Sequence, residues 1–423
     1  MKENNSHNKA KFLGIFVNVI EWYDYALYIY LASIIAELYF PNNDRLMSLI
    51  SSYAVFAAGF IARPVGAWIF GYIGDYYSRK KALFCSLIMM SIPSSLMLFI
   101  PSFEKWGYFS SISILLIRIC QGVAVGGNYG GGFVFTIEHA RKGTRGITGG
   151  LGSFATFSGF LLGSIVCSTL TNNLDKQDLY DWGWRMPFLF SIFSLLIAFY
   201  LGSQVSSEEK PNSKELSPKE SIFSSISKLY SSHPSIMLRA ITIICLDAVG
   251  IYILFFFYKL YLEEIIGMEI EKVYNIHDIG MNIMIIFAVF FGWLSDKIGR
   301  KPILLMVSLS FIITPYIGFN LVKHHPEYAL LVQLVFALTM GACYGALPAF
   351  IVELFPRSIR YSGCSLAFNL SMCIFGGTST IFALWLIKIT NNVSYVALYL
   401  SLIGLLSIIA LSGIKDKYQQ EID

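Results

Sequence analysis

Four of the ionisable side chains that lie inside otherwise apolar stretches are the residues most able to do chemistry. Glu21 and Asp24 are three positions apart, about one helical turn, so their carboxyl groups share a helical face. Arg63 and Arg118 fall in two further apolar stretches. A charge at the centre of a bilayer helix costs about 2.5–3.5 kcal/mol on insertion scales, and such residues are usually paired and functional.

We expect Glu21 or Asp24 to take up a proton. The planar guanidinium groups of the arginines would bind that carboxylate or the carboxylate of a solute. The alternative is a fixed ion pair that only orders the surrounding helices.

Further polar and aromatic residues in apolar stretches could complete such a site. Tyr25 and Tyr28 follow the two carboxylates on the same predicted helix, where aromatic rings could help to enclose a quaternary ammonium group. In the second half of the sequence, Asp247 occupies the place that corresponds to Asp24 in the first half. A functional and a structural interpretation of Asp247 both stay open. Tyr344 and Asn369 could line a cavity, or could form hydrogen bonds between helices.

The elements that must position these residues are membrane-spanning helices. Only 14% of the 423 residues are charged and 55% are hydrophobic, whereas soluble domains carry about 25% charged residues. Twelve apolar stretches, each long enough to cross a bilayer as a helix, can be placed at 12–39, 48–73, 82–101, 107–134, 147–171, 186–203, 239–263, 276–294, 302–322, 328–352, 362–387 and 393–414. The sequence therefore predicts an all-α membrane protein with twelve transmembrane helices.

The longest polar segment, 204–238, divides these stretches six and six. We expect an N-terminal six-helix bundle at 1–203, a cytoplasmic linker at 204–238 and a C-terminal six-helix bundle at 239–423. Basic residues concentrate in the loops on one side, for example in Arg79-Lys80-Lys81 and in Arg300-Lys301. The positive-inside rule then places both termini in the cytoplasm.

The two halves carry related motifs. The segment GYIGDYYSRK at 71–80 recurs as GWLSDKIGRK at 292–301, and a glutamate followed by two arginines occurs at 138–145 and again at 353–360. Two similar six-helix halves around a midplane site are typical of carriers that work by alternating access.

The repeated loop motifs suggest a latch that joins the halves in the outward-open state. Aspartates near helix ends can pair with arginines and with helix N-termini. The expected pairs at the cytoplasmic end are Arg79 with Glu138 and Arg300 with Glu353. The predicted conformational latch consists of six residues: Asp75, Arg79, Glu138, Asp296, Arg300 and Glu353.

At these residues the chain resembles the major facilitator superfamily. The signature G-x-x-x-D-x-x-G-R-[KR] is matched in full at 292–301, while the first copy has Ser78 in place of the second glycine. Further matches narrow the resemblance to the metabolite:proton symporters, closest to the proline/betaine transporters: NVIEWYD at 18–24, ARPVG at 62–66, RICQG at 118–122, GG at 126–127, DWGWRMPF at 181–188 and ELFPRSIRYSG at 353–363.

The resemblance implies a secondary transporter in a bacterial inner membrane. Such a carrier would import a small zwitterionic osmolyte or amino acid with protons, and would use the proton gradient rather than a cofactor. A dicarboxylate or other organic acid is the alternative solute, and a sensor without transport is a further alternative. A functional monomer is expected, with no nucleic-acid partner, no metal and no enzymatic activity.

Two departures from the family pattern affect this expectation. The family usually has an acidic residue after the Gly-Gly of the fourth span, where this chain has Asn128. If that acid contributes to proton coupling, this chain must use another group or couple differently. Osmosensing members also carry a long coiled-coil tail, whereas few residues follow Lys417, so control by such a tail is not expected.

Overall fold

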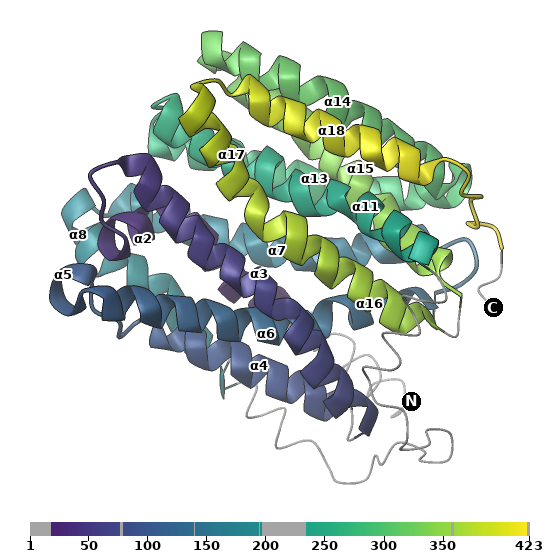
Figure 1. The fold of residues 1–423 in the computed structure, drawn as a ribbon, viewed down its shortest axis with the longest axis horizontal. Coiled ribbons are helices and arrows are strands. Elements are labelled where there is room, and N and C mark those ends of the chain that lie inside the picture. The colour runs from purple at the N-terminus through teal and green to yellow at the C-terminus, as the bar shows by residue number, and fades with distance from the viewer. Residues whose placement is uncertain are drawn as a thin grey trace.

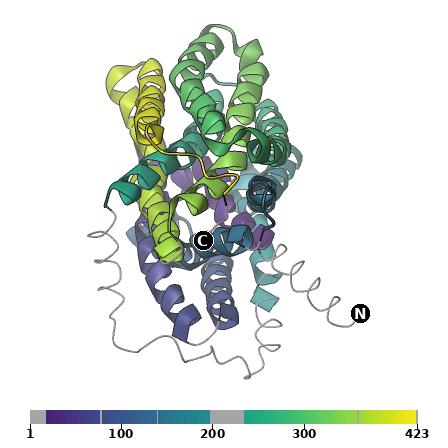
Figure 2. The ribbon, with the colours of Figure 1, turned by 90° about the vertical axis from the view of Figure 1, so that its right-hand side faces the viewer.

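The computed structural model describes residues 18–76, 79–138, 140–193, 195–196, 234–356 and 359–420. Within these residues it gives no account of the side chains at 71–72, 74–76, 79–84, 127–132, 135 and 361–362. The described chain is helical and contains no strand, as the sequence predicted. Figures 1 and 2 show the helices of the first half, in purple and blue, lying beside those of the second half, in green and yellow.

The first half is described from residue 18 to residue 196. Residues 18–30 are helical. They are followed by α2 (Ala32–Tyr39), α3 (Arg45–Tyr76), α4 (Arg79–Leu96), α5 (Phe103–Trp106), α6 (Tyr108–Glu138), α7 (Arg145–Asn173), α8 (Lys176–Asp181) and the 3₁₀ helix η1 (Gly183–Phe188). The predicted linker lies outside the described residues, except that 234–238 begin the next helix.

The second half is described from residue 234 to residue 420. Its elements are α11 (Pro234–Ile251), η2 (Tyr252–Phe257), α12 (Tyr258–Leu260), η3 (Tyr261–Ile265), α13 (Ile270–Ile298), α14 (Arg300–His324), η4 (Pro326–Tyr328), α15 (Ala329–Leu354), α16 (Arg360–Ser371), η6 (Met372–Gly376), α17 (Gly377–Thr390) and α18 (Ser394–Leu411). Three of these are π-helical turns: η2 and η6 lie inside longer helices, and η3 ends one. Such wider turns often occur at functional sites.

Nine helices within the described residues are long and apolar enough to cross a membrane. A helix satisfies its own backbone hydrogen bonds, which is why apolar stretches of this length become helices in lipid. The three predicted spans that are not among the nine are 12–39, 82–101 and 186–203. The structure describes the first and third only in part, and shows the second as α4 with an apolar section at Cys85–Leu96.

Glycines bring α3 and α6 into backbone contact. A Cβ atom on Gly122 would lie 1.8 Å from the carbonyl oxygen of Gly59, and one on Gly126 would lie 1.9 Å from that of Arg63. Close approach of this kind is typical of membrane helices that pack through small residues. The crossing matters for function because it fixes the helices that carry Arg63 and Arg118.

A second close contact joins the two halves. On α7, a Cβ atom at Gly146 would lie 2.3 Å from the carbonyl oxygen of Gly292 on α13, and one at Gly150 would lie 2.6 Å from that of Ala288. The two helices therefore touch through their backbones at one end of the molecule.

The α3–α6 crossing yields a stability prediction. Gly122→Leu would force the two backbones apart, because the obstacle is a carbonyl oxygen of the facing helix rather than a mobile side chain. Overpacking costs about 1–3 kcal/mol, and we expect the upper end of that range here. The measurement is the thermal midpoint of the purified protein in detergent.

Ala54→Leu is the matched control, because Ala54 lies on the exposed side of α3. Equal midpoints for the Gly122 and Ala54 variants would show that the crossing is not held by backbone contact.

Candidate functional site

Arg118 on α6 is completely buried among the helices of the first half, with an exposed fraction of 0%. Its Nη1 donates to Oε1 of Gln121 at 2.6 Å, and Nε2 of Gln121 donates in turn to Oγ of Ser94 at 2.7 Å. Among the described residues, Nε and Nη2 of Arg118 have no hydrogen-bond partner. A buried cation with two unused donors is costly unless an acceptor reaches it.

Aromatic rings surround this guanidinium group. Its carbon Cζ lies 4.6 Å from the ring centroid of Tyr25, 4.7 Å from that of Tyr28 and 4.8 Å from that of Phe56. Cation–π contacts stabilise a desolvated cation, but they leave its in-plane N–H groups available. The rings therefore hold Arg118 in place without satisfying its hydrogen-bond donors.

Arg63 on α3 lies on the same aromatic group. Its Cζ is 5.0 Å from the centroid of Tyr25 and 4.0 Å from that of Phe60, and the side chain is 1% exposed. Two positive charges thus contact one ring. The buried hydroxyl of Tyr25 also has no hydrogen-bond partner among the described residues. This concentration of positive charge and free donors favours an anionic group.

Asp247 on α11 supplies a buried carboxyl group from the second half. It is 2% exposed, and its Oδ1 accepts a hydrogen bond of 2.6 Å from the hydroxyl of Tyr344 on α15. The sequence suggested no partner for Asp247, and Tyr344 is now seen to be one. The ring of Tyr252 in η2 lies 5.4 Å from that of Phe60 and 5.8 Å from that of Phe56, so the two halves meet at this point.

Glu21, Asp24 and Asn369 are also buried but lie in different contacts. Glu21 and Asp24 are 4% and 1% exposed, and Oδ1 of Asp24 accepts from Oγ of Ser191 at 2.8 Å. Nδ2 of Asn369 donates to the carbonyl oxygen of Gly126 at 3.2 Å, which links α16 to α6.

The side chains of three predicted residues lie outside the part of the structure that is described: Asp75, Arg79 and Asn128.

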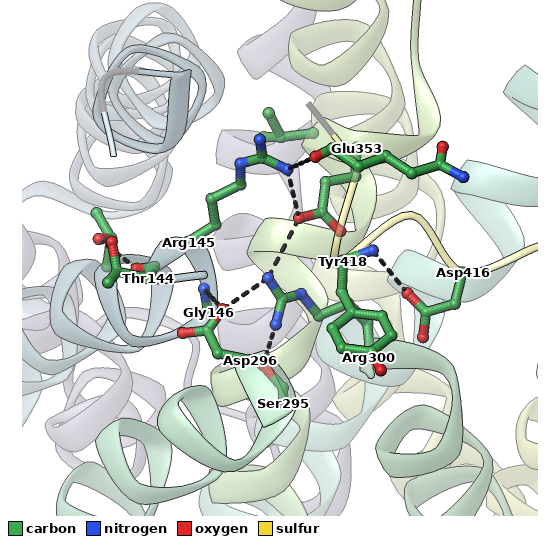
Figure 3. Close-up of polar contacts among 12 residues, drawn as sticks. Thr144, Arg145, Gly146, Ser295, Asp296, Arg300, Glu353, Asp416 and Tyr418 are labelled. Atoms are coloured by element: carbon green, nitrogen blue, oxygen red, sulfur yellow. Dashed lines mark hydrogen bonds and ion pairs between the residues drawn. The ribbon is translucent and has the colours of Figure 1, made fainter. Parts of the chain in front are cut away.

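Four residues of the predicted latch have described side chains, and they lie at one end of the molecule: Glu138, Asp296, Arg300 and Glu353. We call this the motif end, and Figure 3 shows the last three residues there. The two carboxylate oxygens of Asp296 on α13 accept from the backbone nitrogens of Gly146 and Ile147, at 2.9 and 3.0 Å. These amides belong to the first turn of α7, whose helix dipole favours a negative charge. Nη2 of Arg300 pairs with Asp296 at 2.8 Å. The predicted placement of Asp296 at a helix N-terminus is present in the structure.

Further ion pairs cross between the halves at the motif end. Oε1 of Glu353 lies 3.2 Å from Arg300 and 3.4 Å from Arg145 of the first half. The expected Arg300–Glu353 contact is therefore present. Glu138 pairs with Arg360 of the second half at 2.8 Å, a partner that the sequence did not indicate.

The opposite end, defined by Asp44, Arg45, Glu264 and Lys388, is also joined across the halves. Arg45 pairs with Glu264 at 2.5 Å, and Lys388 pairs with Asp44 at 2.6 Å. The hydrogen bond from Lys388 lowers the pKa of Asp44 from its ordinary value. Because both ends are tied, the structure describes a closed state with the Arg118 site between them.

Sequence reasoning missed a polar cluster near the opposite end. Tyr30 and His277 form a hydrogen bond of 3.0 Å between the halves, and Ser164 donates to Asp278. The available signal was a histidine and an aspartate at the start of the apolar stretch 276–294.

A groove elsewhere in the first half does not suit a charged solute. A groove of about 450 Å³ has an apolar lining apart from one threonine: Ile165, Val166, Thr169, Leu170, Met186, Leu189, Phe190 and Phe193. Among the described residues, no three His, Cys, Asp or Glu side chains converge as a metal site would require.

Known proteins resemble this chain over nearly its whole length. The chain is 30% identical to a glycine betaine/proline/ectoine/pipecolic acid transporter of Dickeya dadantii, over 93% of this chain and 80% of that protein. It is 28% identical to a proline/betaine transporter of Escherichia coli K12, with the same coverage. These relatives are transporters, which confirms the prediction of a transporter rather than an enzyme.

Solved structures share the fold. The proton:xylose symporter XylE, bound to 6-bromo-6-deoxy-D-glucose, superimposes with a TM-score of 0.75 at 17% identity, over 97% of this chain and 96% of that one. This likeness confirms the predicted twelve-helix fold. The family model described as Major Facilitator Superfamily matches residues 12–357. The chain therefore belongs to the Major Facilitator Superfamily of membrane transporters.

Proposed function

We propose that this transporter imports a small zwitterion, an osmolyte or amino acid of the proline/betaine type, together with protons. The two six-helix bundles at 1–203 and 239–423 would rock about the central site, joined by the linker at 204–238. The basic loops would lie in the bacterial cytoplasm with both termini, and one chain would suffice for transport.

The observation that carries this proposal is the pair of unused donors on Arg118. Nε and Nη2 of a guanidinium group can together bind both oxygens of a carboxylate, with a geometry that lysine cannot reproduce. The surrounding rings exclude water, so a carboxylate that reaches this group replaces hydrogen bonds that are otherwise missing. A solute with a carboxylate therefore completes the site.

The second half offers a partner for the cationic end of such a solute. Asp247, oriented by Tyr344, brings a negative charge, and the ring of Tyr252 lies 5.4 Å from Phe60. A carboxylate beside aromatic faces suits an ammonium group. Binding a zwitterion would thus connect Arg118 of the first half to Asp247 of the second, as a carrier that closes around its solute requires. The names of the curated relatives support the same class of solute.

A dicarboxylate is the second candidate, and one observation favours it. Arg63 and Arg118 contact the same ring of Tyr25, so two cations lie close enough to hold two carboxylates. In that case Asp247 would repel the solute rather than bind it.

The closed state supports alternating access. The motif end would open when Asp296 leaves the first turn of α7, and the opposite end would open when Arg45 and Glu264 separate. Because each end has its own contacts across the halves, either can open while the other stays closed.

The first prediction from the proposed function concerns Arg118. Arg118→Lys keeps the positive charge but removes the planar fork, and truncating one partner of a buried charged pair costs about 2–5 kcal/mol. We expect glycine betaine to bind at least about 30-fold more weakly. Binding is measured on purified protein in nanodiscs, with Arg141→Lys in an exposed loop as the matched control. Affinities within threefold of each other for the two variants would contradict the proposed carboxylate site.

The second prediction separates the two classes of solute. Proteoliposomes preloaded with unlabelled glycine betaine or proline should drive counterflow of the labelled compound, and a tenfold excess of succinate should leave that counterflow unchanged. The reason is that Asp247 repels a second carboxylate. Counterflow supported by succinate, with none supported by betaine or proline, would instead establish the dicarboxylate function.

The third prediction concerns proton coupling. A buried carboxylate that carries the proton can be replaced by its amide without loss of exchange, because exchange needs no net proton movement. We expect Asp24→Asn or Glu21→Gln to lose pH-driven accumulation and to keep counterflow. Glu104→Gln, at an exposed position in α5, serves as the control. If both variants accumulate solute as the control does, neither carboxylate lies on the proton path.

A further inference from the structure

Three hydrogen bonds cross from the first half to the start of α13, near the opposite end. The hydroxyl of Tyr30 and Nε2 of His277 are 3.0 Å apart, and the hydroxyl of Tyr274 donates to the backbone oxygen of Tyr30 at 3.3 Å. Oγ of Ser164 on α7 donates to Oδ1 of Asp278. Asp278 is partly buried in this contact, and opening the opposite end would separate these groups and expose its carboxyl group fully.

The burial of His277 shows that water has little access to this contact. Its side chain is 1% exposed, and Nδ1 has no hydrogen-bond partner among the described residues. The ring centroids of Tyr30, Phe255 and Phe256 lie 5.3, 5.9 and 5.8 Å from that of the imidazole. No carboxylate among the described residues pairs with the imidazole, so a positive charge on His277 would be unfavourable in the closed contact.

Asp278 has little to stabilise a negative charge once the end is closed. Within the described part of the chain it forms no ion pair, and the Ser164 hydroxyl is the hydrogen-bond donor that reaches its carboxyl group. The nearby cation Lys259 is paired with Glu263 at 3.3 Å and lies over the ring of Tyr274 at 4.1 Å. A carboxylate at a partly buried position such as this one is stabilised when a cation or several donors hold it, and the described residues give Asp278 one donor.

The groups around Asp278 come from every element packed against it. The titratable or charged ones are Tyr30 from the first helix, Cys167 from α7, Lys259 from α12, Glu263 from η3, and Tyr274 and His277 from α13 itself. From α15, the amide of Gln333 packs on Gly280, two residues further along α13, and carries no charge. None of these groups forms a pair with Asp278 that would retain its charge on closure.

We propose that Asp278 is a proton-binding site whose protonation allows the opposite end to close. While that end is open, the carboxylate takes a proton from a hydronium ion and leaves a water molecule. The neutral acid then closes against Ser164, and it returns the proton to water that enters from the motif end once that end opens. The proposal rests on the proton coupling proposed above, and it adds a carboxylate that lies at the contact between the halves.

Asp278→Asn tests this directly, because the amide resembles the protonated acid and should close without a proton. In proteoliposomes we expect glycine betaine counterflow to stay at half the wild-type rate or more. Accumulation driven by an acid outside should fall to a ratio near one, and the alkalinisation that accompanies uptake should disappear. Asp278→Glu, which keeps a titratable group, should restore part of the accumulation. Glu271→Gln, on the exposed first turn of α13, should behave as wild type.

The outcomes are distinguishable. Accumulation by Asp278→Asn equal to that of the Glu271 control would overturn the proposal, since the carboxyl group would then be unnecessary. Loss of counterflow in Asp278→Asn would also overturn it, because a neutral side chain would then fail to allow closure. If the unmodified protein itself shows counterflow but no alkalinisation, the proton coupling of the proposed function fails, and this inference fails with it.

Discussion

The buried guanidinium group of Arg118 is the constraint on which the rest of the site depends. None of the described carboxylates forms an ion pair with it, yet it is fully enclosed. Such a group is stable only if the surrounding helices are held rigidly and if a ligand completes its hydrogen bonds. The glycine contacts between α3 and α6 meet the first requirement. The aromatic rings keep water out, which makes the second requirement selective for a carboxylate.

The two ends of the molecule are closed by different kinds of interaction. At the motif end, Arg300 and Glu353 are almost completely buried and Asp296 bonds to backbone amides of α7. At the opposite end, Arg45 and Lys388 are each 34% exposed, and exposed ion pairs are worth about 0–1 kcal/mol. The opposite end is therefore held more weakly by its ion pairs. The cluster of buried His277 and partly buried Asp278 accordingly has a large share in deciding whether that end closes.

Much of the architecture followed from the sequence, because hydrophobic length and motif repetition are local properties. The apolar stretches, the repeated loop at 292–301 and the pairing of Arg300 with Glu353 could all be recognised along the chain. Contacts that depend on how each helix is oriented about its own axis could not be recognised in this way. Asp247 and Tyr344 are 97 residues apart, and no spacing rule relates them.

The Asp278 cluster was missed for the same reason. Its members come from the first helix, α7 and α13, and each alone looks like an isolated polar residue near a span end. Asp24 was predicted as a site residue, but its partner was not. Its hydrogen bond with Ser191 joins two predicted spans that the sequence did not pair.

The most direct test of this account is a cryo-EM structure of the protein in a nanodisc with saturating glycine betaine. We predict that the carboxylate of the bound betaine lies within about 3 Å of Nε and Nη2 of Arg118, between the two closed ends. Betaine bound with its carboxylate away from Arg118, or Arg118 bonded instead to a carboxylate of the protein, would contradict it.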